Sequence, residues 1–548
     1  MNYDYIIIGG GAAGCVLANR LSENPDTQVC LLEAGPSDKK NPLIKIPVGI
    51  IALMRSKSYN WRYWTTPQKA LNGRRVYIPR GKTLGGSSAV NAMCYTRGHK
   101  WDFDHWESLG NKGWGYKDVL PLFRRSENYE PGENEFHGVG GPVNISDLQS
   151  PMQVSKDFVK AGVEAGYPET DDFNNDVQEG MGLFKVFQKN GERFGAARGY
   201  LHPVLDRPNL TVLTGASANK ILFDGKRATG VEISRNGKTE TLKANDILLS
   251  GGAINSPKLL LLSGVGPKAE LEKHNIPMVH ELPGVGENLQ DHPDILVVQK
   301  SKRWQTLAFS PKSFVWDGPI AVFNYIFRRK DFLTSNVAEA GGFVKSRPEE
   351  EIPDIQFHMS NTRLDNHGLD LTFSIGYGFS GHVCALRPKA RGRLTLQDAN
   401  PASDPNIDPN LLDHPDDMET MVRGVKAVRN IFAQNALKSW CNGEIFPGEA
   451  VQSDEEIRDF IRRKADNIYH PVGTCKMGHD DMAVVDDTLK VHGMQNLRVI
   501  DASIFPTLVG GNTTAPTLMV AEKAADMILA EKNAAVMAAP TQTAVPTA

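Results

Sequence analysis

The sequence has few cysteines, and no two of them are close enough to form a CxxC motif. All six stand far apart along the chain, at Cys15, Cys30, Cys94, Cys384, Cys441 and Cys475. Such spacing supports neither a structural zinc site nor a disulfide framework. We therefore expect reduced thiols, no bound metal and a cytoplasmic location.

Long apolar runs and a strong charge of either sign are also missing. No run reaches the ~18 apolar residues of a transmembrane helix, and no basic segment followed by an apolar one opens the chain, so we expect no cleaved secretory signal. With 61 basic and 64 acidic residues the net charge is −3, which gives no electrostatic reason to expect a nucleic-acid partner. We expect membrane contact at the surface only, through apolar segments such as Pro47–Met54, for which burial in the protein is the alternative.

The first 35 residues carry the clearest pattern. Tyr3–Gly9 is a short β-branched apolar run typical of a buried parallel strand, and Gln28–Glu33 is a second one. Between them, Cys15–Ser22 has apolar residues at helical spacing. The pattern predicts one β-α-β unit, and a chain of 548 residues is long enough for two domains.

The turn between this strand and helix carries the pattern G-x-G-x-x-G, formed by Gly9, Gly11 and Gly14. Gly9 permits a tight turn, Gly11 lets a pyrophosphate approach the backbone, and Gly14 allows close packing of strand and helix. Glu33, at the end of the second strand, is placed to accept hydrogen bonds from a ribose. A glycine-rich turn without a ligand is the alternative, and the pattern leaves NAD and FAD open, excluding only a 2′-phosphate.

Further elements are expected along the chain. We predict strands at Leu210–Thr214, Lys220–Phe223, Gly230–Ile233, Asp246–Ser250 and Leu497–Ile500, and a helix over Ser256–Leu262 with Pro257 near its start. Longer alternating stretches between about 295 and 460, including Asp354–Met359 and Arg393–Leu396, predict a second, sheet-based domain. The tail 533–548 is rich in Ala, Pro and Thr, and we expect it to be disordered.

Several passages resemble the signatures of one enzyme family, the glucose–methanol–choline (GMC) oxidoreductases. They are Gly81–Asn91 with Tyr95, Gly98 and Asp104, then Gly252–Pro257 with Ser263–Gly266, Pro283–His292, Tyr469–Thr474, Asp501–Ser503 and Gly511–Pro516. They follow the family's order over nearly the whole chain. Two more segments, Asn336–Phe343 and Pro388–Arg393, resemble most closely the bacterial membrane-associated alkanol dehydrogenases and the choline dehydrogenases.

This resemblance implies an α/β fold with FAD as the cofactor. A discontinuous, Rossmann-like FAD domain would comprise 1–155, 210–295 and 460–532, and a substrate domain on an antiparallel sheet would comprise 156–209 and 296–459. The implied FAD-binding residues are Gly9, Gly11, Ala12, Gly14, Glu33, Gly85, Gly86, Val90, Asn91, Ala92, Ala218, Asp501, Ala502, Asn512 and Thr513. Some relatives bond the flavin covalently to a histidine where this chain has Val90, so we expect FAD held non-covalently.

The resemblance also assigns the chemistry of alcohol oxidation. Hydride leaves carbon for the flavin, and the protein supplies a base for the hydroxyl proton. A histidine suits this role because its unperturbed pKa is about 6.5. By motif match His470 is the base and Asn512 binds the substrate oxygen, whereas His292 is expected to be structural.

The substrate pocket is predicted less specifically. In choline-oxidising relatives the acid matching Glu339 faces a quaternary ammonium group, and Tyr469 offers an aromatic face to such a cation; a structural salt bridge of Glu339 is the alternative. Phe343 and the aromatics of Trp316–Phe327 are candidates for lining an apolar tunnel or for simple core packing.

The function expected from these residues is oxidation of aliphatic primary alcohols, with electrons passed to a quinone or another acceptor at the cytoplasmic face of a membrane. Choline dehydrogenase and an oxygen-using alcohol oxidase are the nearest alternatives. A lyase or a light-driven decarboxylase on the same fold, and a non-catalytic flavin-binding module, are more remote. The sequence does not indicate an oligomeric state.

Overall fold

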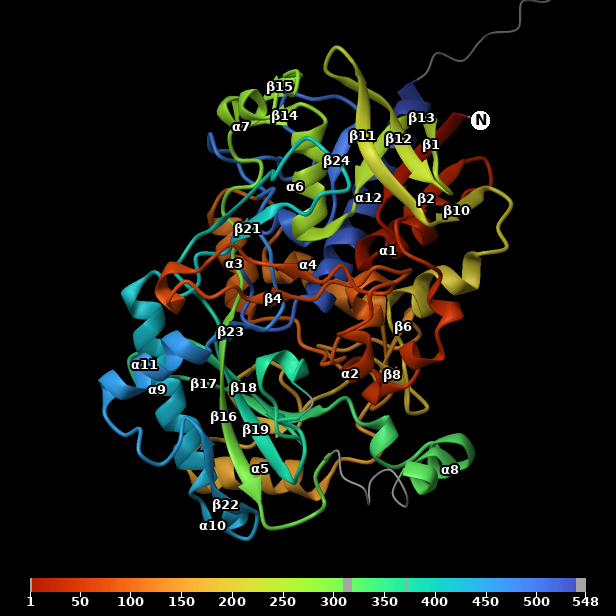
Figure 1. Ribbon diagram of the computed structural model, residues 1–548. Helices are drawn as coiled ribbons and strands as arrows, with labels where there is room; N and C mark the ends of the chain where they lie inside the picture. The colour runs from red at the N-terminus through yellow and green to blue at the C-terminus, as the bar shows by residue number, and fades with distance from the viewer. Residues whose placement is uncertain (1, 309–317, 371, 539–548) are drawn as a thin grey trace, which may run out of the picture.

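Two seven-stranded sheets organise the protein. The computed structural model describes residues 2–308, 318–370 and 372–538, with one sheet in the upper half of Figure 1 and the other in the lower half. Within these residues no helix combines the length and the apolar character that crossing a bilayer requires.

The upper sheet begins with the predicted β-α-β unit. β1 (Asn2–Ile8) and β2 (Val29–Glu33) pair in parallel, and α1 (Ala12–Leu21) connects them. Ile6 and Ile7 are fully buried, as a strand covered on both faces requires. The parallel part of the sheet has the order β10 (Leu210–Thr214), β2, β1, β13 (Lys238–Leu249) and β24 (Leu497–Val499).

β13 belongs to two kinds of pairing. Its first half pairs antiparallel with β12 (Arg227–Arg235), which in turn pairs with β11 (Ala216–Asp224). Its second half pairs parallel with β1. The strand predicted at Asp246–Ser250 is therefore only the buried end of a twelve-residue strand, because the exposed half carries polar side chains that alternation alone does not mark.

The helix predicted from Ser256 begins earlier. α6 spans Gly252–Leu262, so Pro257 is its sixth residue and not an early one. Proline has no N–H to donate four residues back, which frees the Ala253 carbonyl. That carbonyl instead accepts a hydrogen bond of 2.6 Å from the Thr474 hydroxyl.

The lower sheet is antiparallel, in the order β22, β16, β19, β18, β17, β7, with β23 beside β16. α5 (Gln153–Glu164), α9 (Pro415–Phe432) and α11 (Asp454–Lys464) pack against it. Their core contains alternate residues of the strands, such as Ile295 and Phe357, so the intervening residues point to the opposite face. The strands span Cys441–Phe446, Pro293–Ser301, Gly378–Ala385, Ile355–Ser360, Ala338–Val344, Gly180–Leu183 and Asp466–Asn467, in the order named.

Some predicted boundaries differ from the elements. β23 and the first three residues of β16 (293–295) lie in ranges assigned to the FAD domain, although both strands belong to the lower sheet. The π-helical turn Ala197–Leu201 packs on α1, although 156–209 was assigned to the substrate domain. β20 (Arg393–Thr395) pairs with β21 (Asn406–Asp408) in a separate small sheet. The division into two domains therefore stays a prediction, and its limits do not coincide with the ends of these elements.

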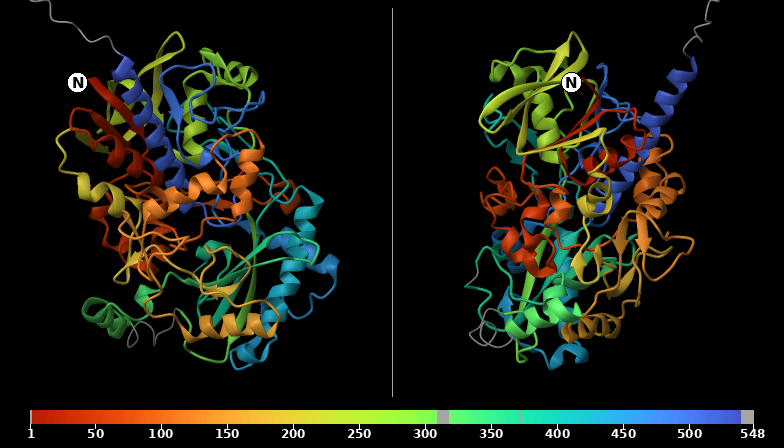
Figure 2. Two further views of the ribbon diagram at one scale, coloured as in Figure 1. Left: turned by 180° about the vertical axis from the view of Figure 1, so that it is seen from behind. Right: turned by 90° about the vertical axis from the view of Figure 1, so that its right-hand side faces the viewer.

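The C-terminal helix α12 spans Thr514–Ala538, so residues 533–538, predicted to be disordered, are helical. Residues 539–548 lie outside the described chain. α12 packs on α1 and on α4 (Tyr116–Ser126), and Figure 2 shows it in blue beside the red N-terminal segment. The first and last helices of the described chain therefore pack against each other.

Candidate active site

A cavity of about 530 Å³ lies where β1, β2 and β13 end and α1 begins. In sheets of this type, ligands bind beyond the carboxyl ends of the strands. The lining includes nine predicted FAD-binding residues: Gly9, Gly11, Ala12, Glu33, Gly86, Ala218, Asp501, Ala502 and Thr513.

The three fingerprint glycines differ in what surrounds them. A Cβ on Gly14 would lie 1.9 Å from the Gly9 carbonyl oxygen, so only glycine allows α1 to pack this closely on β1. A Cβ on Gly9 would lie 2.4 Å from the Ser250 oxygen. A Cβ on Gly11 would meet only that same oxygen, at 3.9 Å, and would point into free space. Since Gly11 lines the cavity, this is the glycine that leaves room for a ligand.

Glu33 is held at the edge of this cavity. Its two carboxylate oxygens accept hydrogen bonds from the backbone N–H groups of Gly10 (3.0 Å) and Gly35 (2.7 Å). Burial raises the pKa of this carboxyl to about 7, and the two backbone donors oppose that rise. Each oxygen retains acceptor capacity for a ribose hydroxyl.

Asp501 organises the far wall of the same cavity. Its carboxylate accepts from the Ser256 hydroxyl (2.6 Å) and from the backbone N–H groups of Gly252 (2.8 Å) and Ser503 (2.8 Å). Gly252 begins α6, so the acid stabilises a helix N-terminus. The motif predicted from Asp501 thus meets the one predicted from Gly252, 249 residues away in sequence.

A second cavity, of about 220 Å³, adjoins the first between the two sheets. The two cavities share the lining residues Arg80, Ser87, Thr513 and Thr514. Val90, Asn91, Ala92, Tyr469, His470 and Asn512 line the second cavity. Gly86 lines the first cavity, while Gly85 lines a smaller neighbouring one.

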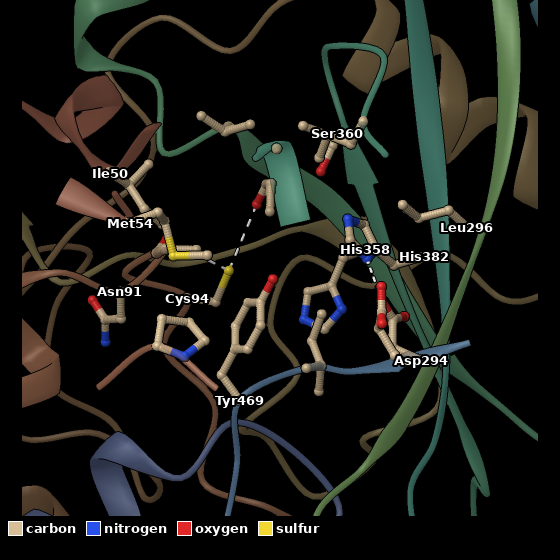
Figure 3. Close-up of a pocket in the computed structure, with 18 of the residues that line it drawn as sticks. Ile50, Met54, Asn91, Cys94, Asp294, Leu296, His358, Ser360, His382 and Tyr469 are labelled. Carbon is tan, nitrogen blue, oxygen red and sulfur yellow. Dashed lines mark hydrogen bonds and ion pairs between the residues drawn. The ribbon is translucent and has the colours of Figure 1, made fainter. Parts of the chain in front are cut away.

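The lower sheet supplies one wall of the second cavity, mainly through alternate residues of its strands, and Ile295 of β16 also lines it. Asp294 and Leu296 come from β16, His358 and Ser360 from β18, and His382 from β19. Figure 3 shows Asp294, His358 and His382 grouped at one end, Ile50 and Met54 at the other, and Tyr469 between them.

His470 and Asn512 meet at this cavity. The His470 Nε2 lies 3.2 Å from the Asn512 Nδ2, and the His470 backbone N–H donates to Asp291 at 2.7 Å. The Asn512 Oδ1 accepts from the Thr96 hydroxyl (3.1 Å) and from the Gln356 Nε2 (3.2 Å). These two donors orient the amide so that its NH₂ group faces the histidine.

The electrostatics keep this histidine neutral. Burial, followed by the neighbouring His292, His358 and Arg80, lowers the pKa of the His470 imidazole well below its usual 6.5. At neutral pH the ring is therefore unprotonated and able to accept a proton, as general base catalysis requires.

Two predicted pocket residues lie elsewhere. Glu339 is completely buried and accepts from the Met152 N–H (2.8 Å) and from the hydroxyls of Ser155 (2.7 Å) and Ser335 (2.6 Å). It follows Ala338, which lines the cavity, so the strand turns its side chain toward α5 on the other face. Glu339 does not line the cavity, so this structure gives its predicted substrate contact no support. The predicted salt bridge is not formed among the described residues, because the donors to Glu339 are neutral.

Phe343 also lies away from the cavity lining. It is fully buried, with its ring centroid 5.1 Å from that of Phe173, and the alternative of core packing holds. Of the aromatics in Trp316–Phe327, Trp316 lies outside the described residues and Phe323 and Phe327 are exposed.

Among the cavity residues that sequence reasoning missed are Arg80, Asp294, His358 and His382. Polar residues recurring at every second position of an apolar strand were a usable signal for His358 and His382. Asp294 is followed by apolar residues of β16 and shows no such recurrence. Arg80 follows no such pattern; burial lowers its pKa to about 10, and its charge lies where the two cavities join.

These residues fit FAD. The cavity beside Gly11 follows the N-terminus of α1, which favours anionic phosphates, and the charge of Arg80 adds to it. The adjoining cavity brings His470 and Asn512 to the end where a flavin ring would lie.

Comparisons with known proteins agree with this geometry. Models of the GMC oxidoreductase family match residues 3–294 and 388–521. An alcohol dehydrogenase (acceptor) of Pseudomonas putida is 51% identical, over 96% of each chain. The mitochondrial choline dehydrogenase of Mus musculus is 44% identical over 96% of this chain and 89% of its own. The crystal structure of pyridoxine 4-oxidase from Mesorbium loti superposes with a TM-score of 0.87 at 31% identity, over 96% of this chain and 99% of the other.

The cavity at the upper sheet, the histidine–asparagine pair in the adjoining cavity and these matches over nearly the whole length lead to one conclusion: the chain belongs to the GMC oxidoreductase family.

Proposed function

We propose that this protein oxidises aliphatic primary alcohols to aldehydes, with FAD held non-covalently and electrons passed to a quinone-type acceptor. The observation that carries the proposal is an apolar cavity in which a buried, unprotonated His470 lies beside Asn512. The 51% identical alcohol dehydrogenase (acceptor) supports the same reaction.

The residues act on the hydroxyl group of the substrate. When bound, FAD supplies the acceptor for the hydride that leaves the alcohol carbon. The His470 Nε2 takes the hydroxyl proton, and the Asn512 Nδ2 donates a hydrogen bond to the substrate oxygen as negative charge develops there. Thr96 and Gln356 hold the amide in the orientation that this donation needs.

The cavity lining favours an uncharged substrate over choline. Its apolar members include Ile50, Ile51, Met54, Leu296, Val337, Leu364, Phe446, Phe460 and Ile468. Every carboxylate among the described lining residues has a basic partner: Asp294 pairs with His382 at 2.7 Å, Asp365 with Lys464 at 2.9 Å, and Asp466 with Arg74 at 3.1 Å. A quaternary ammonium group would find an aromatic face at Tyr469 but no uncommitted carboxylate.

Two residues support non-covalent FAD. Val90, at the position where some relatives carry a flavin-linked histidine, offers no nucleophile. The nearby Cys94 thiol lies in the same cavity, and burial raises its pKa to about 12, so it is not a reactive thiolate. Acid precipitation should therefore release the flavin completely into the supernatant; yellow protein in the pellet would contradict the proposal.

The substrate is tested by anaerobic stopped-flow bleaching of the flavin near 450 nm with 1-octanol and with choline. We expect rapid bleaching by octanol and little by choline. The reverse result would assign the protein as a choline dehydrogenase. Bleaching by neither would contradict alcohol oxidation. Where an alcohol does bleach the flavin, the rates of reoxidation by quinone analogues and by oxygen separate a dehydrogenase from an oxidase.

For the acceptor, we propose contact with the cytoplasmic surface of a membrane through α8 (Gly318–Arg328). Its residues Ile320, Phe323, Ile326 and Phe327 are 52–71% exposed, and basic residues follow at the end of the helix. An amphipathic helix of this kind suits an anionic lipid surface. Figure 1 shows α8 projecting from the lower sheet, and it contacts η9 (Phe332–Thr334), which packs on η3 (Pro47–Gly49) next to the cavity residue Ile50.

Co-sedimentation with vesicles containing phosphatidylglycerol tests this contact. The double change Ile326→Asp and Phe327→Asp should abolish binding while the flavin spectrum is kept. The matched control is Val177→Asp, an exposed apolar residue in a different region. Equal sedimentation of all three proteins would remove α8 from the proposal.

A further inference from the structure

A second buried histidine lies directly behind the proposed base. His292 ends the passage Pro283–His292, immediately before β16, and it is completely buried. Its ring stands at 90° to the ring of His470, with centroids 5.2 Å apart. Sequence reasoning treated it as structural, but its hydrogen bonds determine the state of its neighbour.

The proton on His292 is located by a backbone group. The His292 Nε2 lies 2.9 Å from the Leu386 carbonyl oxygen. A carbonyl only accepts, so Nε2 carries the hydrogen. Burial lowers the pKa of His292 to about 3, so the ring is neutral and its other nitrogen, Nδ1, is an acceptor.

That acceptor locates the proton on the base. The His292 Nδ1 lies 3.0 Å from the His470 Nδ1. Since the first atom only accepts, the second donates. A neutral His470 then has its hydrogen on Nδ1 and its free lone pair on Nε2, the atom that faces the cavity.

The contact between His470 and Asn512, at the other end of this row of hydrogen bonds, requires the same proton positions. The Asn512 Nδ2 only donates, and it lies 3.2 Å from the His470 Nε2. Reversing every proton would place a bare His292 Nε2 against the Leu386 oxygen and two N–H groups against each other at Asn512. Both ends would lose a hydrogen bond, and a buried polar group without a partner is costly.

We infer that His292 is a positioning residue that fixes the tautomer and the ring plane of His470, so that the Nε2 lone pair points at the substrate hydroxyl. This inference rests on the proposed alcohol oxidation. It assigns no contact with substrate or cofactor to His292.

A histidine does this differently from a carboxylate. A carboxylate in the same place would stabilise the protonated base and raise its pKa. The neutral His292 orients the ring without that effect. The charged and titratable groups facing the pair are Arg80, Asp291, His358 and Arg387. The positive charges of Arg80 and Arg387 also disfavour protonation of either histidine.

The first test is the tautomer itself. Protein labelled with ¹⁵N-histidine, with His470→Gln used to assign the signals, should show His470 protonated on Nδ1 in long-range ¹H–¹⁵N spectra. This measurement does not depend on turnover. A wild-type His470 protonated on Nε2 would overturn the inference.

The second test compares two substitutions. His292→Leu removes the acceptor, whereas His292→Asn places an amide oxygen near the former Nδ1. We expect flavin reduction by octanol to fall about 10²-fold in His292→Leu, since a base in the wrong tautomer is ineffective, with normal FAD content and an altered pH profile. His292→Asn should recover most of the rate and the wild-type profile.

Equal rates and pH profiles in His292→Leu and the wild type would overturn the inference, as would impairment of His292→Asn equal to that of His292→Leu. If the leucine variant does not fold, the asparagine variant and the wild-type tautomer still decide. Failure of the wild type to be bleached by any alcohol would instead contradict the proposed function, leaving the tautomer measurement intact.

Discussion

At the scale of single residues, the low pKa of His470 has a direct kinetic consequence. A base whose pKa is lowered well below 6.5 stays unprotonated throughout the neutral range. The rate of flavin reduction by alcohol should therefore be constant from about pH 9 to pH 6.5 and fall only below that value, as the ring becomes protonated. Anaerobic stopped-flow measurements across this range check the prediction, and a limb centred above pH 7 would contradict it.

Glu339 gives a second prediction at this scale. Its carboxylate accepts from one backbone and two hydroxyl donors, so Glu339→Gln places an amide NH₂ against at least one donor. We expect a loss of about 1–3 kcal/mol in the free energy of unfolding, with the KM for octanol unchanged. Denaturant titration and steady-state kinetics measure the two effects, with the exposed Glu349→Gln as the control.

A changed KM for choline or octanol in Glu339→Gln, with stability unaltered, would restore a role in substrate binding. The residue also illustrates a limit of sequence reasoning. Its motif predicted the strand, but a bulge beside Ala338 and the alternation of the strand decide which face the acid occupies. His470 and Asn512 were assigned by the resemblance of their motifs to those of the family, and the structure brings their side chains to within 3.2 Å of each other.

At the scale of elements, two glycines in the turn from β1 to α1 have different roles, one in folding and the other in cofactor binding. Gly14→Ala would bring a Cβ to 1.9 Å from the Gly9 oxygen, and neither backbone segment has room to move. We expect a loss of more than about 3 kcal/mol in stability or no folded protein. Thermal unfolding followed by circular dichroism measures this loss.

Gly11→Ala is the matched comparison. Its Cβ meets no protein atom closer than 3.9 Å and enters the cavity, so the protein should fold normally with strongly reduced FAD content. Normal FAD content in Gly11→Ala would contradict the placement of the phosphates beside this residue.

Elements were predictable to different degrees. β1, α1, β2 and β10 were predicted closely because each is a continuous apolar segment between turn residues. The exposed half of β13 and the early start of α6 were not, since the first depends on pairing with β12 and the second on the Thr474 hydroxyl that replaces the missing proline donor. Tertiary contacts, absent from local pattern, determined both.

At the scale of the whole molecule, Glu522 ties the C-terminal helix to the N-terminal unit. It is fully buried on α12 and accepts from Arg20 of α1 (2.8 Å), from Arg125 of α4 (2.7 Å) and from the Tyr200 hydroxyl (2.7 Å). Glu522→Gln should lower the free energy of unfolding by roughly 2 kcal/mol, because it leaves two partly buried cations without their partner.

Asp526 provides the control, because it contacts the same Arg125 but is 51% exposed. Asp526→Asn should cost less than about 1 kcal/mol. Denaturant unfolding of both variants at equal FAD saturation measures the difference, and similar losses in the two would mean that the buried network adds little to the union of the chain ends.

The alternation of the lower sheet has a consequence for how such a protein changes over generations. Residues such as Val297 and Phe357 pack the core, while their neighbours Leu296 and His358, together with Asp294 and Ser360, line the cavity. One strand therefore carries two independently variable sets of positions. Mutations in the set that lines the cavity change its shape and charge while the folding core is inherited intact, so substrate preference can diverge among descendants faster than architecture.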